Sequence, residues 1–353
     1  MLHGANLRSF RREGKVLFSL PPVDLECRPI RPHPCAGKAR KEKAVAGRRA
    51  SLHISSHASG FSLRTFFHAK RSSGEGRLTP RKLRVREMGG GERAGRPHPR
   101  WVIKLGTGTL STPEGDLDLP QIRRLVEQVS ALKGDGWEIV LVSSGAIGSG
   151  MGLLGYRRRP TAIEELQACA AVGQPQLMRL YEELFAERGY HVAQLLLTYL
   201  DLDSRTLYEN ARKTMEHLLS KEIFIPVINE NDVVSYEEIK FGDNDRLSAH
   251  VASMVEADKL IILSNVPGLR ERDDGEGRII PLVEEITEEI EAMAGKTRSE
   301  RSVGGMVTKI EAARIVGSAG IPMQIADGRE KGILRKIAAG ERVGTLFLAS
   351  GKR

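Results

Sequence analysis

The chain has 353 residues, of which 40% are hydrophobic and 28% are charged, and its formal net charge is +9. No stretch approaches the ~20 apolar residues that a membrane-spanning helix requires, and VLFSLPPV, from Val16, is too short and proline-broken for a secretory signal. With only Cys27, Cys35 and Cys169 present, neither a disulfide framework nor a CxxC metal site is available, so we expect a soluble protein of the reducing cytoplasm in which Cys169 is buried.

Residues 1–98 form a basic leader that differs from the rest of the chain. Residues 1–100 hold 23 Lys and Arg against 7 Asp and Glu, so the positive charge belongs to this part and the remainder is acidic. It shows no sustained apolar period, and we expect it to be disordered. The favoured explanation is a start codon assigned too early, with Met88 as the alternative start; an organelle-targeting or flexible tail and a nucleic-acid-binding arm are the other two.

The ordered part starts near Trp101 with a predicted βαβ unit. Residues 102–105 read as a buried strand that ends in glycines. Asp118 is a suitable N-cap before Pro120, and apolar residues keep helical spacing from there to a stop at residues 134–136. The apolar run EIVLVSS predicts the next strand, and a glycine-rich turn follows it.

The same alternation continues to the end of the chain. It predicts helices over 162–189, 203–221, 245–257 and 304–320, strands over 191–198, 224–230, 258–265 and 322–327, and further apolar segments at 278–286 and 344–348. Continuous apolar strands separated by helices are typical of a parallel sheet with both faces covered. We therefore expect residues 99–353 to form one α/β domain, an open, mostly parallel sheet sandwiched by helices.

Three glycine-containing loops are expected at the carboxyl ends of the strands, where ligands bind in open α/β sheets. Lys104 precedes Gly106 and Gly108, residues 143–146 read SSGA, and residues 302–309 read SVGGMVTK with Lys309 about one helical turn in. Each loop alone is also explained by a tight turn or a solvated lysine. Three anion-seeking loops and two lysines at one edge together favour a site for a phosphoryl group in transfer.

The segment INENDVVSYEEIKFGDNDRLSAH, residues 228–250, is unusually rich in short polar side chains. Asn and Asp compete with backbone hydrogen bonding and favour turns, so this segment indicates a binding site for a small, amine-bearing molecule. Asp243 and Asp245 are candidates to fix the lysines or reach a metal ion, and Asn244 and Asp232 to hold an ammonium group. The sequence shows neither an HExxH motif nor the sequence pattern of a Ser/His/Asp catalytic triad, so zinc-enzyme and hydrolase functions have no support.

Six segments resemble the sequence blocks of the amino-acid kinases, in that family's order, from about Trp101 to Phe347. The resemblance, most specific to the glutamate branch in its INEND and GDND pair, implies ATP-dependent phosphorylation of the side-chain carboxylate of L-glutamate to L-glutamyl 5-phosphate, the first step of proline biosynthesis. It also implies Mg²⁺ as cofactor with no direct protein ligand assigned, a homo-oligomer, and glutamyl phosphate reductase as functional partner. The six segments are VIKLGTGTL, VSSGAIGSG, AAVGQPQLM, PVINENDVV, FGDNDRLSAHVA and GGMVTKIEAARI.

The family's functional residues carry over onto matching positions of this chain. Lys104 and Lys309 would flank the phosphoryl group during its transfer, and Asp245 would position both lysines. The residues that the resemblance assigns to glutamate are Ser144, Asp232, Asn244 and Asp243. Those that it assigns to ATP are Lys104, Gly106, Ser264, Asn265, Ser302, Val303, Gly304, Gly305, Met306 and Lys309.

Two departures from the family pattern lie on the nucleotide side. Family members often carry Thr-Asp or Ser-Asp where this chain has Ser264-Asn265, and GTGG where it has SVGG. ATP affinity therefore follows less directly from the resemblance than substrate class does. Many bacterial relatives also continue into a C-terminal PUA domain, and no regulation or RNA contact through such a domain is expected of these 353 residues.

Two alternative functions remain open at this point. A kinase of another acidic substrate, acetylglutamate or aspartate, is compatible with the lysines and glycine loops, but the paired Asn and Asp clusters argue against it. Nucleic-acid binding through the leader rests on charge alone, and the leader's phenylalanines are not interleaved with its basic run around Arg81.

Overall fold

A computed structural model describes residues 11–12, 15–16, 98–112, 115–235, 244–272, 277–294 and 305–349. The chain divides into two compact units, Met1–Leu78 and Thr79–Arg353. In the first unit, β1 (Arg11–Arg12) and β2 (Lys15–Val16) pair in antiparallel orientation. The rest of the basic leader up to residue 97 lies outside the described residues, so its disorder stays a prediction.

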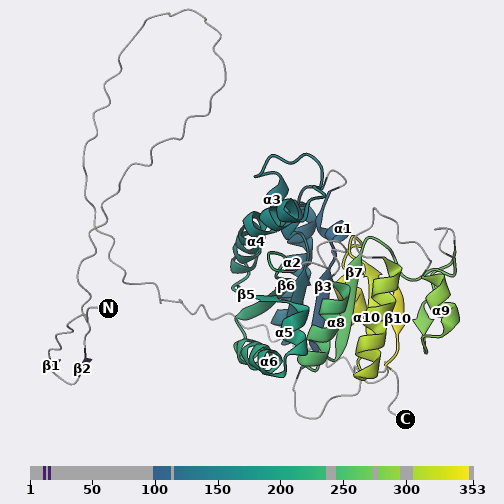
Figure 1. The fold of residues 1–353 in the computed structure, drawn as a ribbon. Coiled ribbons are helices and arrows are strands. Elements are labelled where there is room, and N and C mark those ends of the chain that lie inside the picture. The colour runs from purple at the N-terminus through teal and green to yellow at the C-terminus, as the bar shows by residue number, and fades with distance from the viewer. Residues whose placement is uncertain are drawn as a thin grey trace, which may run out of the picture. The chain divides into compact units, whose positions relative to one another are not determined.

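The described strands of the second unit form one eight-stranded sheet in the order β5-β6-β4-β3-β7-β9-β10-β8 (Figure 1). Every neighbouring pair is parallel except β9 and β10, which confirms the expected mostly parallel sheet. The strands are β3 (Arg100–Leu105), β4 (Glu138–Ser143), β5 (His191–Leu197), β6 (Phe224–Glu230), β7 (Lys259–Ser264), β8 (Leu282–Val283), β9 (Met323–Asp327) and β10 (Thr345–Phe347).

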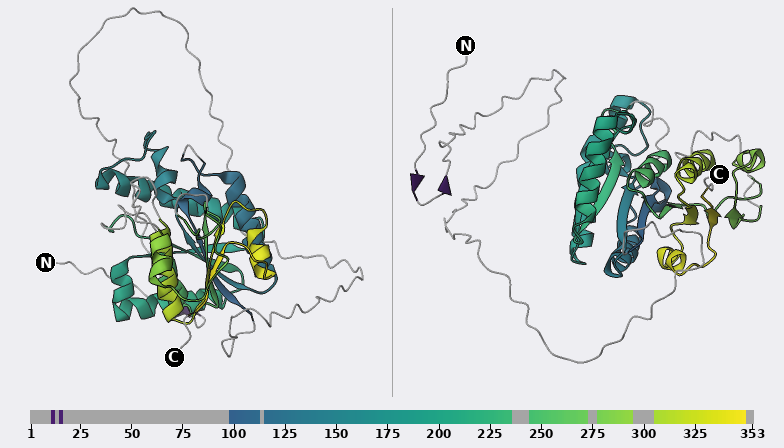
Figure 2. Two further views of the ribbon diagram at one scale, coloured as in Figure 1. Left: turned by 90° about the vertical axis from the view of Figure 1, so that its right-hand side faces the viewer. Right: turned by 90° about the horizontal axis from the view of Figure 1, so that it is seen from below.

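Helices lie on both faces of this sheet (Figure 2). They are α1 (Thr107–Leu110), α2 (Leu119–Gly134), α3 (Ala146–Met151), α4 (Ile163–Ala186), α5 (Tyr199–Asp203), α6 (Arg205–Leu219), α8 (Asp245–Met254), α9 (Glu288–Met293), α10 (Met306–Ser318) and α11 (Ile333–Ala338). Helix α2 begins as its sequence predicts, because the Asp118 carboxylate accepts the N–H of Gln121 at 3.1 Å and Pro120 lies in the first turn.

The alternation of side chains along the strands builds two hydrophobic cores. Val102 of β3 packs in a core with α6, α8 and α10, whereas its neighbour Ile103 packs on the opposite face with α2, α4 and α11. Lys104 follows Ile103 and therefore lies on the same face as Val102. A lysine at the end of this strand is thus directed to the side of the sheet that carries α8 and α10.

Helices α3 and α4 cross at unusually short distance because two glycines meet there. A Cβ on Gly173 would lie 1.9 Å from the carbonyl oxygen of Ala146, and one on Gly150 would lie 2.0 Å from that of Cys169. Only glycine permits this approach of two backbones. The crossing fixes α3, and with it the loop that enters α3, against the long helix α4.

In the part of the chain that the structure describes, no helix is both long and apolar enough to cross a membrane.

Candidate active site

Parallel pairing brings the ends of β3, β4, β6 and β7 to one edge of the sheet. Lys104 is the penultimate residue of β3, Ser144 follows β4, and Ser264 ends β7. Asp245 begins α8 and Lys309 lies in the first turn of α10. Site residues that were predicted from separate segments of the sequence therefore lie together at this edge of the sheet.

Two lysines share one buried carboxylate at the centre of the site. The Nζ atom of Lys104 lies 2.6 Å from Oδ1 of Asp245, and the Nζ atom of Lys309 lies 2.9 Å from Oδ2. Lys104 is 5% exposed, Lys309 3% and Asp245 0%. The three side chains place one surplus positive charge at the end of β3, in surroundings that hold little water.

The pKa of the Asp245 carboxyl lies well below its usual range. Burial alone would raise this pKa, because it disfavours the charged form. The charges of Lys104 and Lys309, together with the hydrogen bonds that both donate, outweigh burial and lower it. Asp245 is therefore an ionised carboxylate that contacts both lysines.

The start of α10 is tied to the same carboxylate. The hydroxyl of Thr308 lies 3.1 Å from Oδ2 of Asp245 and 2.8 Å from the carbonyl oxygen of Gly305, the N-cap residue of α10. A single hydroxyl hydrogen serves these two acceptors, so Thr308 holds the helix entrance and the carboxylate together. Met306 is the first residue of α10, which places it beside this entrance.

We call Lys104, Asp245 and Lys309 the triad. Beside it, a chain of buried amide side chains runs from α4 to the loop after β4. The Nδ2 atom of Asn229 donates to Oε1 of Gln174 at 2.8 Å, and Nδ2 of Asn244 donates to Oδ1 of Asn229 at 2.8 Å. Asn244 also donates to the carbonyl oxygen of Ser143 at 2.8 Å and lies 3.4 Å from the hydroxyl of Ser144. Asn244 is thus held in one orientation by Ser143 and Asn229, and Gln174 of α4 in turn holds Asn229.

The turn from β4 into α3 has a fixed and unusual backbone. Gly145 adopts a left-handed conformation with φ of 106°, which favours glycine. The Ser143 hydroxyl donates to the carbonyl oxygen of Ser144 at 3.0 Å and accepts from the hydroxyl of Tyr181, 2.9 Å away. Burial raises the pKa of Tyr181 to about 12, so this phenol stays protonated and able to donate.

A small hollow of about 40 Å³ opens beside these residues. This volume holds on the order of three water molecules. Asp232, which is half-buried, belongs to the wall. The hollow is lined by Thr107, Ser144, Gly145, Ala146, Ile147, Gly148, Arg159, Asn229, Glu230, Asp232 and Asn244.

The residues expected at ATP converge on the other side of Lys104. The N–H of Gly106 donates to the carbonyl oxygen of Leu263 at 3.1 Å, so the loop after β3 runs against the end of β7. A Cβ on Gly106 would lie 3.6 Å from Nζ of Lys104, and one on Gly108 would lie 3.1 Å from the side chain of Asn265. Ser264, 9% exposed, therefore ends its strand beside the glycine loop that follows Lys104.

Four expected site residues, Asp243, Ser302, Val303 and Gly304, lie outside the described residues. The others lie together at the sheet edge, although their roles stay predictions. The sequence had not singled out Gln174, Thr308 or Arg159. Gln174 stands in the AAVGQPQLM segment, which was the one signal pointing to it.

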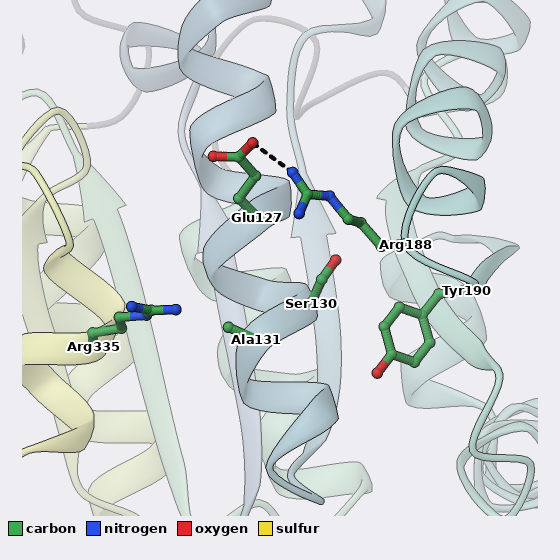
Figure 3. Close-up of a pocket in the computed structure, with 6 residues that line it drawn as sticks. All are labelled: Glu127, Ser130, Ala131, Arg188, Tyr190 and Arg335. Carbon is green, nitrogen blue, oxygen red and sulfur yellow. Dashed lines mark hydrogen bonds and ion pairs between the residues drawn. The ribbon is translucent and has the colours of Figure 1, made fainter. Parts of the chain in front are cut away.

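A larger hollow of about 430 Å³ lies elsewhere and contains none of the expected site residues (Figure 3). Glu127 of α2 and Arg188, in the turn before β5, form an ion pair of 2.6 Å across it, and Arg335 of α11 approaches from the other side. Arg188 and Tyr190 precede β5, so this hollow is at the amino end of that strand, away from the edge that carries Lys104. Its paired charges give it no evident chemistry.

Within the described residues, no group of three or more His, Cys, Asp or Glu side chains is arranged to hold a metal ion. Asp245 directs one oxygen to each lysine.

Residues 99–327 match the model of the amino acid kinase family. The chain is 46% identical over 252 residues to "Glutamate 5-kinase" of Caldanaerobacter subterraneus, covering 70% of this chain and 68% of that protein. It is 46% identical over 256 residues to "Glutamate 5-kinase" of Clostridium acetobutylicum, covering 72% and 96%, and 48% identical over 257 residues to that of Deinococcus radiodurans, covering 72% and 70%. Among solved structures, the UMP kinase of Bacillus anthracis matches with 17% identity and a TM-score of 0.48, covering 72% of this chain and 98% of that one.

Proposed function

The chain belongs to the amino acid kinase family, and we propose that it transfers the γ-phosphoryl group of ATP to the side-chain carboxylate of L-glutamate, giving L-glutamyl 5-phosphate for proline biosynthesis. The observation that carries this proposal is the pair of ammonium groups on one buried carboxylate, next to a hollow of amides and acids. The identity of 46–48% to proteins named glutamate 5-kinase supports the choice of substrate over aspartate or acetylglutamate.

The protein takes little covalent part in the transfer of the phosphoryl group. The glutamate side-chain carboxylate is already the nucleophile, so no base has to remove a proton. One of its oxygens forms a bond to the γ-phosphorus while the bond from that phosphorus to the β–γ bridging oxygen breaks, and ADP leaves with the electron pair. Negative charge accumulates on the equatorial oxygens during this exchange, and positive charge fixed nearby lowers the barrier.

Lys104 and Lys309 supply that charge from opposite sides of Asp245. Both ammonium groups contact this carboxylate, and an ammonium group carries three N–H donors, so each lysine is suited to bind phosphate oxygens. Asp245 is a positioning residue in this mechanism, because it holds the two lysines in place before ATP arrives. Such preorganisation avoids the cost of arranging solvent dipoles during the reaction.

Glutamate occupies the hollow with its side chain directed to the triad. Asp232 pairs with the α-ammonium group, Asn244 accepts a hydrogen bond from the same group through its Oδ1 atom, and Ser144 donates to a carboxylate oxygen. Asn244 is suited to this because the amide chain through Asn229 fixes its orientation and because it directly precedes Asp245. Asp243 belongs to the same pocket by its position in the sequence.

ATP lies against the loops on the far side of Lys104. Its phosphates approach Gly106 and the start of α10, with Gly305, Met306 and Lys309, and its nucleoside lies near the end of β7, with Ser264 and Asn265. Ser302, Val303 and Gly304, which the resemblance assigns to ATP, directly precede Gly305 in the sequence. Bound together with ATP, Mg²⁺ would supply further positive charge to the β- and γ-phosphates.

The product is an acyl phosphate, which water hydrolyses readily, so a reductase that consumes it, glutamyl phosphate reductase, is the proposed functional partner. We place the reaction in the cytoplasm, where ATP is supplied, and propose a homo-oligomer.

Release of ADP by the full chain, measured in a coupled assay with ATP and Mg²⁺, tests the function directly. The proposal predicts turnover with glutamate at least tenfold above that with aspartate or acetylglutamate. A chain that starts at Met88 is predicted to retain this turnover, since the leader contributes no described site residue. Preference for either of the other two acids, or no ADP release with any of them, would overturn the proposal.

A further inference from the structure

Glutamate carries an ammonium group and a carboxylate on the same carbon atom, and the hollow has to supply a partner for each of these two charges. Asp232 offers a carboxylate for the α-ammonium group, but the α-carboxylate beside it also has to leave water. Among the described residues that line the hollow, Arg159 is the single cationic side chain. The remaining lining side chains are neutral apart from Glu230 and Asp232.

Arg159 reaches the hollow from the connection between α3 and α4. It is the last of three consecutive arginines and directly precedes Pro160, which restricts its backbone to extended conformations. Arg157 and Arg158 are exposed and do not line the hollow. Arg159 is exposed as well, but unlike its two neighbours it lines the hollow, so its position calls for a specific explanation.

The electrostatic surroundings of Arg159 also indicate that it belongs to the binding site. Its side chain remains exposed, yet nearby protein atoms displace enough water to lower its pKa, and the charge of Asp232 acts in the opposite direction. The guanidinium stays charged at any physiological pH. Arg159 and Asp232 are therefore close enough to interact, and a ligand with adjacent positive and negative groups could bridge them.

We propose that Arg159 binds the α-carboxylate of glutamate and thereby determines specificity for an α-amino acid over a simple carboxylic acid. This inference rests on the proposed function. The α-carboxylate and α-ammonium groups share one carbon, so their partners must be neighbours, as Arg159 and Asp232 are. A guanidinium can form two parallel hydrogen bonds to a carboxylate, which adds direction to the charge. The side-chain carboxylate then extends past Asn244 to the triad.

The position of Arg159 at the wall of the hollow also allows a ligand to enter. The guanidinium is carried on a connecting segment and on a long, exposed side chain, so it can withdraw without disturbing the sheet. Binding is then expected to exchange the interaction between Arg159 and Asp232 for two interactions with the ligand.

Removing one charge from the substrate separates this role from a structural one. 4-Aminobutanoate is glutamate without its α-carboxylate, and it retains the ammonium group and the reacting carboxylate. The experiment compares kcat/KM for both compounds in the full chain, in Arg159→Met, in Arg159→Lys and in the matched control Arg158→Met. Where turnover of 4-aminobutanoate is too slow, its inhibition constant against glutamate takes the place of kcat/KM.

Arg159→Met is expected to lower kcat/KM for glutamate about 10- to 100-fold through KM, with the values for 4-aminobutanoate and the KM for ATP unchanged. Arg159→Lys is expected to recover part of the loss, and Arg158→Met is expected to match the wild type. An equal loss for both compounds would assign Arg159 a structural role, and no loss with glutamate would remove it from the site; either result overturns the inference. Absence of glutamate turnover in the wild type would instead overturn the proposed function, and this inference with it.

Discussion

Lys309 and Asp245 are 64 residues apart in the chain, yet the ammonium group of one donates a 2.9 Å hydrogen bond to a fully buried oxygen of the other. The second oxygen of the same carboxylate faces Lys104, which comes from a third element. Three segments that are far apart in the sequence thus meet at one carboxylate, and the proposed phosphoryl transfer depends on this arrangement.

Replacing Lys309 by methionine tests its role in transfer. Methionine preserves much of the length and removes the charge, so kcat is expected to fall about 10²- to 10³-fold with little change in KM for glutamate. The loss should concentrate in kcat because the phosphate gains charge in the transition state. Initial-rate kinetics check this, with the exposed Lys331 changed to methionine as control. A normal kcat in a folded Lys309→Met protein would exclude Lys309 from catalysis.

Asp245→Asn tests the coupling between charge and stability. The folded protein holds the Asp245 pKa below its unfolded value of about 3.9, so the carboxylate stabilises the fold fully above that pH and progressively less as the pH falls. At pH 7 the variant is expected to lose about 3–5 kcal/mol, because two buried lysines lose their partner. Between pH 5 and pH 3 the wild type should lose more stability than the variant.

Urea denaturation at pH 7, 5, 4 and 3 measures both effects. Parallel pH profiles for wild type and Asp245→Asn would mean that the carboxylate titrates alike in the folded and unfolded chains, contrary to its burial between two lysines.

Asp232→Ala tests the position of glutamate. Loss of the carboxylate leaves the substrate ammonium without a charged partner, and the KM for glutamate is expected to rise about 10- to 100-fold. The KM for ATP should stay unchanged, since Asp232 lines the hollow on the glutamate side. Steady-state kinetics with each substrate varied in turn measure the two constants. A rise confined to ATP would show that the two substrates have been assigned to the wrong sides of Lys104.

Gly173→Ala tests whether the crossing of α3 and α4 fixes the loop around Ser144. The added methyl group would lie 1.9 Å from the carbonyl oxygen of Ala146, so α3 must shift. We expect a loss of about 1–3 kcal/mol in the free energy of unfolding and a higher KM for glutamate. Gly152→Ala is the matched control, because no atom lies within 4 Å of its added methyl group. Equal stability of the two variants would show that the crossing tolerates expansion.

The sequence predicted the elements that carry long apolar runs or clear end signals. Helix α2 shows why, since Asp118, Pro120 and a glycine stop define both of its ends. Helices α5, α9 and α11 have five or six residues, too few to display a helical period, and they were not foreseen. The antiparallel direction of β10 depends on the path of the preceding connection, which has no local sequence signal.

The site followed from sequence only where its residues stand in polar or glycine-rich loops at strand ends, as Lys104 and Asp245 do. Gln174 lies in the middle of α4, and its contact with Asn229 exists only because that helix packs across the sheet. The contact of Thr308 with Asp245 likewise requires α8 and α10 to lie side by side. Such partners are set by tertiary packing, so spacing along the chain does not reveal them.

A structure of the full chain with ADP, glutamate, Mg²⁺ and a planar fluoride mimic of the transferring phosphoryl group examines the central claim most directly. The ammonium groups of Lys104 and Lys309 are predicted to lie within hydrogen-bond distance of the mimic while each keeps its contact with Asp245. Either ammonium group turned away from the mimic, with the glutamate side-chain carboxylate elsewhere, would contradict the account.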